Sequence, residues 1–494
     1  MSEPTAAGLS RELTEVQRTA LVELLRVFPV VDELGARFAR AGHELHLVGG
    51  SVRDALLGRL GDDLDFATSA TPDQTLRVLT GWAASTWETG REFGTVGAAR
   101  NGLRLEITTY RAEAYDGVSR NPVVEYGTNL LDDLGRRDFT VNAMAVSVPG
   151  HEFTDPYGGL ADLAKGVLKT PGTPQRSFGD DPLRMLRAAR FAAQLRFAVD
   201  PAVLTAMREM AGDLSRITAE RIRDEFTKLL SGADPVRGLR LLVDTGLADQ
   251  FLPELSGLKL EIDEHAQHKD VYEHTLTVVR NAVALESVPT PDDPAAGGPD
   301  FVLRMAALMH DVGKPATKAV GPDGRVSFHH HEVVGARLTK QRMKALKYPK
   351  DVTTDVVELV GLHLRFYGYG QGEWTDSAVR RYVTDAGPLL SRLHKLTRSD
   401  CTTRNRRKAV ALSADYDALE ERIARLAAEE DLARVRPDLD GNAIMELLGI
   451  PPGPLVGQAW RHLKDLRLER GPLEHDEAVA ELHRWAAENG VKPG

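Results

Sequence analysis

Asp63 and Asp65, two carboxylates separated by one residue, form the first pair in the sequence whose types and spacing suggest chemistry. Residues i and i+2 of a β-strand point to the same side, so on a strand these two carboxylates would lie close together. Such a pair repels unless a divalent cation lies between its members. Taken alone, an Asp-x-Asp pair is more often a solvated turn, so the interpretation depends on the residues around it.

A glycine-rich turn precedes this pair. In the segment Leu47–Thr68, a short apolar strand runs into Gly49-Gly50 and is followed by a helix that carries Ser51 and Arg53. Backbone amides without side chains can approach a phosphate closely, and the start of a helix favours anionic charge. After such a turn, the two aspartates favour a metal site. They suit two Mg²⁺ ions that hold a nucleoside triphosphate and an attacking hydroxyl.

Later polar residues extend this candidate site. Glu106 lies in an apolar strand segment, where a glutamate is costly without a cation or a basic partner. We predict that it is a third metal carboxylate, with a structural ion pair as the alternative. In the segment "RRDFTVNAMA", Arg136 and Arg137 can bind triphosphate oxygens. Asp138 and Asn142 can bond a ribose hydroxyl or order the turn.

Histidines and aspartates recur between residues 270 and 400. A lone histidine would most often be a core or surface residue. The adjacent pair His310-Asp311, followed by Val-Gly-Lys-Pro, is a stronger signal, and Lys314 of this motif could contact a phosphate. Imidazole and carboxylate ligands together suit Mn, Fe, Ni, Co or Zn better than Mg. The pair His310-Asp311 therefore marks a second candidate metal site.

The composition bounds the rest of the molecule. A chain of 494 residues is long enough for three or four modules. The single cysteine, Cys401, excludes an intramolecular disulfide and fits a reducing compartment. The sequence has neither a signal-peptide core nor an apolar run long enough to span a bilayer, so we expect a cytoplasmic protein with no membrane partner.

The net charge of −10 is unusual for a protein that acts on nucleic acid, but a local basic surface matters more than the total. Arginines crowd the segment 176–223, and a second basic run covers residues 404–408. A solvated helix face is the alternative interpretation of either cluster. The residues predicted to contact RNA are Arg190, Arg216, Arg221 and Arg223.

Apolar spacing divides the chain into a mixed part and a helical part. Short apolar runs with glycine breaks, such as "FGTVGAAR" and "LRLEITTY", predict strands up to about residue 150, whereas helical periodicity prevails after residue 180. The polar stretch from Ala112 to Gly135 predicts a mobile lid, and Ser287–Asp300 predicts a loop. We therefore predict an α+β fold, in which an N-terminal mixed-sheet domain is followed by all-α modules.

Several linked motifs resemble the class II tRNA nucleotidyltransferase and bacterial poly(A) polymerase family. The resemblance begins in residues 49–65 and continues in 136–143, 155–170, 180–195 and 217–230. These motifs occur in the family's order and cover roughly the first half of the chain. The resemblance implies a nucleotidyltransferase head followed by helical neck and body modules.

In that family, a Glu-Asp-x-x-Arg motif of the neck helix selects the incoming base, and the matching residues here are Asp180, Asp181 and Arg184. A carboxylate accepts from Watson–Crick edges and a guanidinium donates to them. One helical turn would place Asp181 and Arg184 side by side. The alternative is an i, i+3 salt bridge with Asp180 as the helix cap. The sequence departs from the family at Asp180, where glutamate is usual.

The histidine-rich module resembles the HD phosphohydrolase superfamily. The resemblance implies one metal site formed by His274, His310, Asp311 and Asp400, and a second ion held by His331 and His363. Within "FHHHEVVGA", the family pattern selects His331 because the ligand directly precedes the glutamate. A degenerate HD fold without activity is the alternative.

The resemblance as a whole implies the addition of CCA to the 3′ end of tRNA from CTP and ATP, with Mg²⁺ in the head and Ni²⁺, Mn²⁺, Co²⁺ or Fe²⁺ in the HD site. Alternatives are a poly(A) polymerase, a CC- or A-adding enzyme, or an HD phosphohydrolase with a nucleotide-binding head. The oligomeric state stays open. The implied nucleotide-binding residues are Gly49, Gly50, Ser51, Arg53, Arg136, Arg137, Asp138, Asn142, Asp181, Arg184 and Arg187. The implied modules are an N-terminal helical extension (1–40), the catalytic head (41–150), the neck and body (151–258), the HD domain (259–404) and a helical tail in contact with tRNA (405–494).

Overall fold

The computed structural model describes residues 29–59, 61–114, 123–126, 129–259, 270–289, 296–323, 326–366, 374–402, 406–430 and 437–491. The chain forms two compact units, and each is described by itself. The first comprises Met1–Leu229 and Arg237–Gln250, and the second comprises Leu230–Val236 and Phe251–Gly494. Among the described residues, no helix has both the length and the apolar character to cross a membrane.

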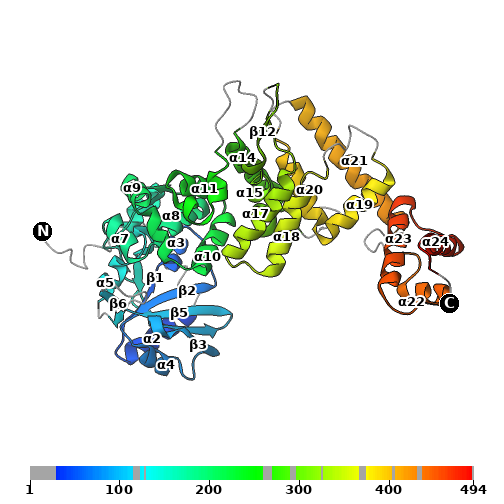
Figure 1. Ribbon diagram of the computed structural model, residues 1–494. Coiled ribbons are helices and arrows are strands. Elements are labelled where there is room, and N and C mark those ends of the chain that lie inside the picture. Colours follow the sequence, from blue (N-terminus) through cyan, green and yellow to red (C-terminus); the bar gives the residue numbers. More distant parts are fainter. Residues whose placement is uncertain are drawn as a thin grey trace. The chain divides into compact units, whose positions relative to one another are not determined.

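A seven-stranded mixed sheet forms the head of the first unit, with the strand order β3-β4-β5-β2-β1-β8-β9 (Figure 1). All its strand pairs are antiparallel except β2 with β5, which are parallel. The predicted α+β fold is confirmed. The strands are β1 (Leu45–Val48), β2 (Asp63–Thr68), β3 (Ser85–Gly90), β4 (Thr95–Arg100), β5 (Leu103–Thr109), β8 (Ala145–Ser147) and β9 (Phe153–Thr154).

Alternating side chains give this sheet a buried face and an open face. Along β5, Leu103, Leu105 and Ile107 are buried, whereas Arg104 and Glu106 are exposed. β2 follows the same alternation at its start. The helices α2 (Pro29–Arg40) and α4 (Pro72–Leu79) pack against strands of the sheet. The period of two therefore brings the polar residues of neighbouring strands onto one face.

Parts of two predicted segments can be compared with the structure. Of the helical extension predicted for residues 1–40, the structure describes residues 29–40, which form α2. Of the lid predicted between Ala112 and Gly135, the described parts are the strands β6 (Arg111–Ala114) and β7 (Val123–Tyr126) and the helix α5 (Leu130–Gly135). Residues 115–122 and 127–128, and residues 290–295 of the predicted loop, lie outside the described residues.

Helices follow the head in the first unit. At their start, Gly159 packs so closely on the head that an added Cβ would lie 2.2 Å from the carbonyl oxygen of Thr140, so only glycine fits. α8 is apolar on most of its surface and is largely buried. The elements are α6 (Gly159–Lys165), β10 (Val167–Leu168), α7 (Pro174–Asp180), α8 (Leu183–Leu195), β11 (Ala198–Val199), α9 (Pro201–Met210), α10 (Ala219–Leu230), α11 (Pro235–Asp244) and α12 (Leu247–Phe251). The short helix α13 (Pro253–Ser256) already belongs to the second unit.

Helices also dominate the second unit. α14 packs against α15 and α20, and α18 packs against α15 and α17, so that these helices surround a common core. The first group is α14 (Val271–Leu285), α15 (Phe301–Met309), α16 (Lys314–Thr317), α17 (His331–Ala345), α18 (Lys350–Leu362), α19 (Asp376–Ala386) and α20 (Leu390–Asp400). The last group is α21 (Arg406–Glu430), α22 (Gly441–Leu448), α23 (Pro454–Arg470) and α24 (His475–Glu488).

The last helices pack around their own apolar core, which includes Leu448, Leu463 and Leu482. The sequence predicts that Asp440 or Asn442 caps α22 and that residues 451–453 end it. Asp440 is the cap, since its side chain accepts a hydrogen bond from the Ala443 amide at 2.9 Å. The helix ends earlier than predicted because Gly449 adopts a left-handed conformation that glycine tolerates.

A buried ion pair joins α14 and α15 within the second unit. The Arg304 guanidinium donates to both carboxylate oxygens of Glu286 at 2.8 and 2.5 Å. It also donates to the carbonyl oxygens of Leu230 and Gly232, each at 2.7 Å. Both charged residues are buried. A buried charge is tolerated when it is fully paired, and here the arginine satisfies a carboxylate and two carbonyls at once.

We therefore expect Arg304→Met to lower the free energy of unfolding of the second unit by about 3–5 kcal/mol, because it leaves the Glu286 carboxylate buried without its cationic partner, although the Asp300 amide still donates to it. Urea denaturation followed by circular dichroism measures this loss. The matched control is Arg381→Met, which breaks an exposed pair with Glu469 and should cost at most about 1 kcal/mol. Equal destabilisation by the two substitutions would contradict the assignment.

Candidate functional site

The parallel register of β2 and β5 brings three carboxylates together on the open face of the head. Asp65 lies opposite Glu106, and Asp63 lies opposite Arg104. Asp63, Asp65 and Glu106 are all exposed. The apolar strand segment around Glu106 indicates a buried position, and the structure shows that this is wrong. Its position beside Asp65 keeps Glu106 as the candidate third metal carboxylate.

The carboxylates of this row disfavour one another's charge. Desolvation by surrounding protein atoms, followed by the negative charge of Glu106, raises the pKa of Asp65 to about 6, although Arg137 acts in the opposite direction. The side chain is still reached by solvent. Crowded oxygen ligands that repel one another are the donor set that a hard divalent cation prefers, so these residues fit Mg²⁺.

The turn at Gly49 brings a guanidinium to the edge of this row. Gly49 has a φ of +69°, and an added Cβ would lie 2.8 Å from an Arg137 nitrogen and 3.9 Å from a carboxylate oxygen of Asp65. The positive φ favours glycine, and a side chain here would also displace the Arg137 guanidinium from the edge of the row. Ser51 is predicted to offer its hydroxyl to a phosphate, but in the structure this hydroxyl is bonded within the protein. Its hydroxyl accepts a hydrogen bond from the Asp65 amide at 2.9 Å and thus ties the turn to β2.

Asp133 holds both arginines of the segment that follows α5. Its carboxylate lies 2.7 Å from the Arg136 guanidinium and 3.1 Å from that of Arg137. These guanidiniums hold the pKa of Asp133 below its usual range, against the effect of burial, which would raise it. Asp133 is absent from the predicted site residues, although its i, i+3 and i, i+4 spacing from two arginines is a recognisable signal.

A buried polar chain connects the head to the neck helix α8 within the first unit. Arg53 donates to the Asn142 side chain at 2.6 Å, and Asn142 donates to Asp138 at 2.9 Å. Arg187 of α8 donates to the other oxygen of Asp138 at 2.7 Å. Burial would raise the pKa of Asp138, but Arg187 and Asn142 hold it at about 2. In this structure, Asp138 and Asn142 therefore order the turn and fasten the head to the neck.

The same chain continues into α10. Glu225 lies 3.6 Å from Arg187 and 3.1 Å from Arg190, and all three guanidiniums of Arg53, Arg187 and Arg190 lie over the Phe191 ring. Arg190 is buried. The prediction that it contacts RNA is therefore wrong for this structure, because its charge is used inside the protein. Glu225 was not predicted, since sequence spacing does not reveal a partner from another helix.

The base-reading pair predicted in the neck is not formed side by side. α7 ends at Asp180, and Asp181 adopts an extended backbone that begins the next turn. Its carboxylate accepts from the Leu183 amide at 3.1 Å and its carbonyl accepts from the Arg184 amide at 3.0 Å, so Asp181 contacts the backbone of this turn rather than the Arg184 guanidinium. The Asp181 carboxylate lies 3.0 Å from Arg221. Arg184 donates instead to the Ser177 hydroxyl at 3.0 Å and to the Arg136 carbonyl at 2.5 Å. The alternative, an i, i+3 salt bridge capped by Asp180, is not formed either.

The remaining predicted RNA-binding arginines lie at or near the surface of the first unit. Arg216 is exposed and donates to the Gly179 carbonyl at 3.2 Å. Arg223 is partly exposed and pairs with Asp224 at 2.8 Å. Arg221 is exposed and pairs with Asp181. These three guanidiniums can reach a ligand, whereas Arg190 cannot.

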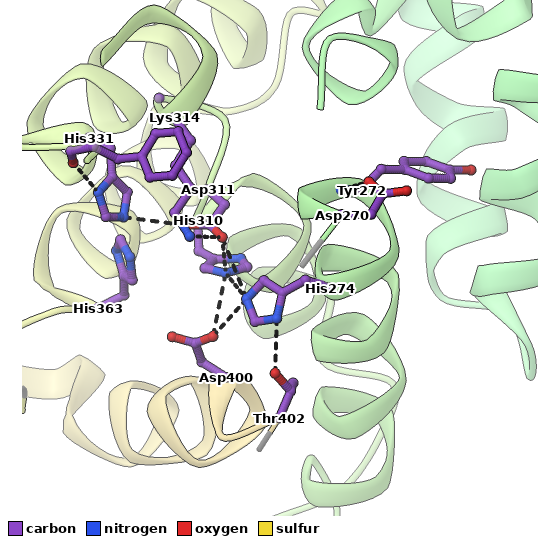
Figure 2. A network of polar contacts seen from close by, with 12 residues as sticks. Asp270, Tyr272, His274, His310, Asp311, Lys314, His331, His363, Asp400 and Thr402 are labelled. Carbon is purple, nitrogen blue, oxygen red and sulfur yellow. Dashed lines mark hydrogen bonds and ion pairs between the residues drawn. The ribbon is translucent and has the colours of Figure 1, made fainter. Parts of the chain in front are cut away.

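The predicted ligands of the second metal site converge in the second unit (Figure 2). They come from the ends or inner faces of five helices. The donor atoms form two groups, each within 4.8 Å: His274, His310 and Asp400 in one, and Asp311, His331 and His363 in the other.

Asp311 lies between these two groups. One of its oxygens lies 3.2 Å from His310 and 3.5 Å from His274, and the other lies 3.3 Å from His331. With one oxygen toward each group, Asp311 would be available as a ligand to a cation held by either of them. The Lys314 ammonium pairs with Asp311 at 2.6 Å, which places it beside the candidate ligands. Its contact with a phosphate stays a prediction.

Each histidine is oriented through its second ring nitrogen. Nδ1 of His310, His331 and His363 lies 2.7–2.8 Å from a backbone carbonyl oxygen three residues earlier, and Nδ1 of His274 lies 3.0 Å from the Thr402 hydroxyl. Such contacts fix the ring and direct Nε2 inward, as in most metal-binding histidines.

One ring nitrogen of His363 indicates that these residues fit a metal ion. Nε2 of His363 is buried and has no hydrogen-bond partner. Burial and the neighbouring His310 lower the pKa of His363 to about 4, so its ring is neutral, which is the form that binds a metal. A neutral, oriented and otherwise unsatisfied imidazole fits a transition-metal ion.

A mixed sheet with a carboxylate row beside a glycine turn, followed by a helical neck, defines a nucleotidyltransferase. Residues 45–169 match the Poly A polymerase head domain family, residues 196–258 match the family described as "Probable RNA and SrmB- binding site of polymerase A", and residues 271–427 match the HD domain family. The chain is 36% identical to the A-adding tRNA nucleotidyltransferase of Deinococcus radiodurans over 452 residues, which cover 90% of this chain and 95% of that protein. The chain therefore belongs to the tRNA nucleotidyltransferase and poly(A) polymerase family, as the motifs predicted.

Two further relatives differ in how much of the chain they match. The CCA-adding enzyme of Geobacillus sp. (strain WCH70) is 41% identical over 228 residues, which cover 46% of this chain and 55% of that protein. The chain thus spans about half the length of that relative. The solved structure of the Bacillus stearothermophilus CCA-adding enzyme in complex with CTP has a TM-score of 0.66 and 25% identity, and the match covers 94% of this chain and 98% of that one.

Because the candidate ligands of the HD site form two groups, substitutions in them should change the metal content to different extents. We expect Asp311→Ala to lose bound transition metal from both ligand groups, because its two oxygens face both, whereas His363→Ala should lose it from one. Inductively coupled plasma mass spectrometry after loading with Mn²⁺ or Co²⁺ and desalting measures the change. The matched control is His330→Ala, which removes an exposed neighbouring imidazole and should leave the metal content unchanged. Wild-type metal content in a folded Asp311→Ala protein would contradict the assignment.

Proposed function

We propose that this protein adds nucleotides to the 3′ end of tRNA without a nucleic-acid template, using CTP and ATP to build CCA. The observation that carries the proposal is the row of Asp63, Asp65 and Glu106 beside the Gly49 turn and the Arg137 guanidinium. The full-length similarity to a tRNA nucleotidyltransferase supports the same class of substrate.

The residues of the head supply defined steps of this reaction. Asp63, Asp65 and Glu106 would hold Mg²⁺, which stabilises the charge of a transferring phosphoryl group when bound. Arg137 lies beside the row and can bind the triphosphate oxygens. The 3′-hydroxyl of the RNA attacks the α-phosphorus of the nucleotide, and pyrophosphate leaves.

The neck residues would act by exchanging partners. To contact the edge of a base, Asp181 would have to give up its ion pair with Arg221. Arg184 would have to give up its hydrogen bonds to Ser177 and to the Arg136 carbonyl. Both side chains are held by polar contacts that a base edge can replace in kind, because it offers donors and acceptors of its own. Arg187 contributes indirectly through Asp138 and Arg53, whose guanidinium lies near Gly50.

An A-adding enzyme is the second candidate, and the full-length similarity to the A-adding enzyme of D. radiodurans favours it. Purified protein should be incubated with tRNA transcripts that end in –N, –NC and –NCC, each with CTP or ATP. A CCA-adding enzyme extends all three with the appropriate nucleotides. An A-adding enzyme extends only the –NCC transcript, with ATP. No extension of any transcript would overturn the proposal.

The HD site supports a second activity, the metal-dependent hydrolysis of phosphate esters. Four oriented imidazoles and two carboxylates favour a transition metal such as Ni²⁺, Mn²⁺, Co²⁺ or Fe²⁺. Bound there, such an ion would activate a water molecule for attack on phosphorus. Because the head keeps its three carboxylates, we place this hydrolysis second to nucleotide addition.

We expect Asp63→Ala or Asp65→Ala to lower nucleotide incorporation at least about 100-fold, because transition-state charge stabilisation is lost. Binding of tRNA, measured by filter retention, should stay within about two-fold, because these carboxylates hold metal rather than RNA. The neighbouring exposed carboxylate offers a matched control, and Asp62→Ala should incorporate CTP and ATP like the wild type. Near-normal incorporation by Asp65→Ala would refute the assignment.

The two chemistries should separate by mutation. Replacing His310 and Asp311 with alanine should abolish hydrolysis of 2′,3′-cyclic or simple phosphate esters, while nucleotide addition to tRNA survives. Hydrolysis by the wild type should require Ni²⁺ or Mn²⁺ rather than Mg²⁺. Circular dichroism must show that the double variant is folded. Continued hydrolysis by that folded variant, or a wild-type protein without bound metal and without hydrolysis, would contradict the proposed HD activity.

A further inference from the structure

A tryptophan lies in line with the carboxylate row on the open face of the head. The sheet register pairs Asp65 with Glu106, Glu106 with Gly97, and Gly97 with Trp87. Side chains of directly paired residues share one face of a sheet. Four neighbouring strands therefore present, in one row, two carboxylates, a position without a side chain and an indole.

The missing side chain at Gly97 lets the indole lie toward the carboxylates. A Cβ added to Gly97 would lie 2.0 Å from two ring atoms of Trp87, so the ring crosses directly over this residue. The Arg104 guanidinium lies 5.3 Å from the centre of a Trp87 ring and 3.9 Å from the Asp63 carboxylate. Trp87 and Arg104 thus form a continuous surface that reaches Asp63, which we call the Trp87–Arg104 platform.

This platform is accessible to a ligand. Trp87 is partly exposed on the edge strand β3, and the Arg104 and Asp63 side chains are 69% and 84% exposed. The buried face of the sheet does not contain these side chains. The Trp87 ring could cover Gly97 without any contact to Arg104. Packing against Gly97 therefore does not explain why the Arg104 guanidinium lies over this ring beside the carboxylates.

The reaction requires two substrates on different sides of the carboxylates. The Gly49 turn and Arg137 lie on the β1 side of Asp65, where we place the triphosphate. The attacking hydroxyl and the leaving pyrophosphate must lie roughly in line across the α-phosphorus. We therefore place the RNA on the other side of the carboxylates, over β5, β4 and β3.

The size and chemistry of the platform match one nucleotide. β4 lies two strand spacings, about 10 Å, from β2, which is comparable to the reach of a nucleotide from its 3′-oxygen to the far edge of its base. Aromatic rings stack on any base, and guanidiniums bind phosphate oxygens. Both properties suit the end of an RNA chain whose 3′-hydroxyl is at the carboxylates.

We infer that the Trp87–Arg104 platform binds the 3′-terminal nucleotide of the RNA primer, with the base stacked on Trp87 and its phosphate facing Arg104. This inference rests on the proposed nucleotide addition, and it assigns the site of the second substrate. Trp87 is a binding residue in this assignment and takes no part in proton transfer or metal binding.

The first test separates primer binding from nucleotide binding. Trp87→Ala should raise KM for the tRNA primer about 5- to 150-fold, the range for loss of one base–aromatic stack, and leave KM for CTP and ATP unchanged. Trp87→Phe should restore most of the primer affinity. Thr86→Ala, on the opposite face of β3, is the matched control and should behave like the wild type.

The second test uses a primer that lacks its terminal base. The wild type should discriminate against a primer with an abasic 3′-terminal nucleotide, and Trp87→Ala should lose this discrimination, because no stack remains to be lost. A structural role of Trp87 would instead impair both primers equally. Circular dichroism checks that Trp87→Ala is folded.

The outcomes distinguish the two proposals. If the wild type adds no nucleotide to any transcript, the proposed function fails. If the wild type is active but Trp87→Ala keeps the wild-type KM for the primer, or keeps its discrimination against the abasic primer, this inference is overturned. A Trp87→Ala protein with unchanged kinetics and an altered sedimentation coefficient would assign the platform to a protein contact instead and would equally overturn it.

Discussion

Carboxylates held close together repel one another, and both candidate sites depend on a fold that prevents them from separating. In the head, the restraint is the backbone register of β2 and β5, which keeps Asp65 beside Glu106. Among the helices of the second unit, the restraint is the set of backbone carbonyls that fix the imidazoles around Asp311. In both sites the repulsion between carboxylates can be relieved by a bound cation, but the ligand atoms differ. Exposed oxygen ligands suit Mg²⁺, and buried, oriented nitrogen ligands suit a transition metal.

Pairing decides which arginines can meet a substrate. Arg187 and Arg190 lie on the same helix, yet their charges are neutralised inside the first unit by Asp138 and Glu225. Arg187 holds the head against α8, and Arg190 holds α8 against α10. Arg137, by contrast, is paired with Asp133 on one side and still reaches the Gly49 turn on the other. A count of basic residues therefore overstates the number of cations that are available to RNA or triphosphate, because buried guanidiniums are used for structure.

Alternation along the strands gives the head its catalytic face. One face of β5 carries the apolar residues that form the core, and the other carries Arg104 and Glu106. Because the period of two is shared by neighbouring strands, the polar face continues from β2 across β5 and β4 to β3. The glycine at position 97 then decides how far a side chain from β3 can extend across this face. The same sheet can thus hold a triphosphate on one side of its carboxylates and an RNA end on the other.

The sequence by itself determined the family and the α+β class, and it predicted the Asp63–Asp65 pair and six candidate ligands of the HD site. The aspartate pair depends on a short spacing that a strand preserves, whereas the six candidate ligands, which are spread over residues 274–400, depend on the resemblance to a family. Only the tertiary structure decided that Glu106 is exposed beside Asp65, that Arg190 is buried, and that Asp181 pairs with Arg221 rather than with Arg184. The physical reason is the same in each case. Strand pairing, helix packing and the break at Pro182 bring together residues that are distant in the chain, and the partner that a charged group finds there depends on geometry that spacing along the sequence does not contain.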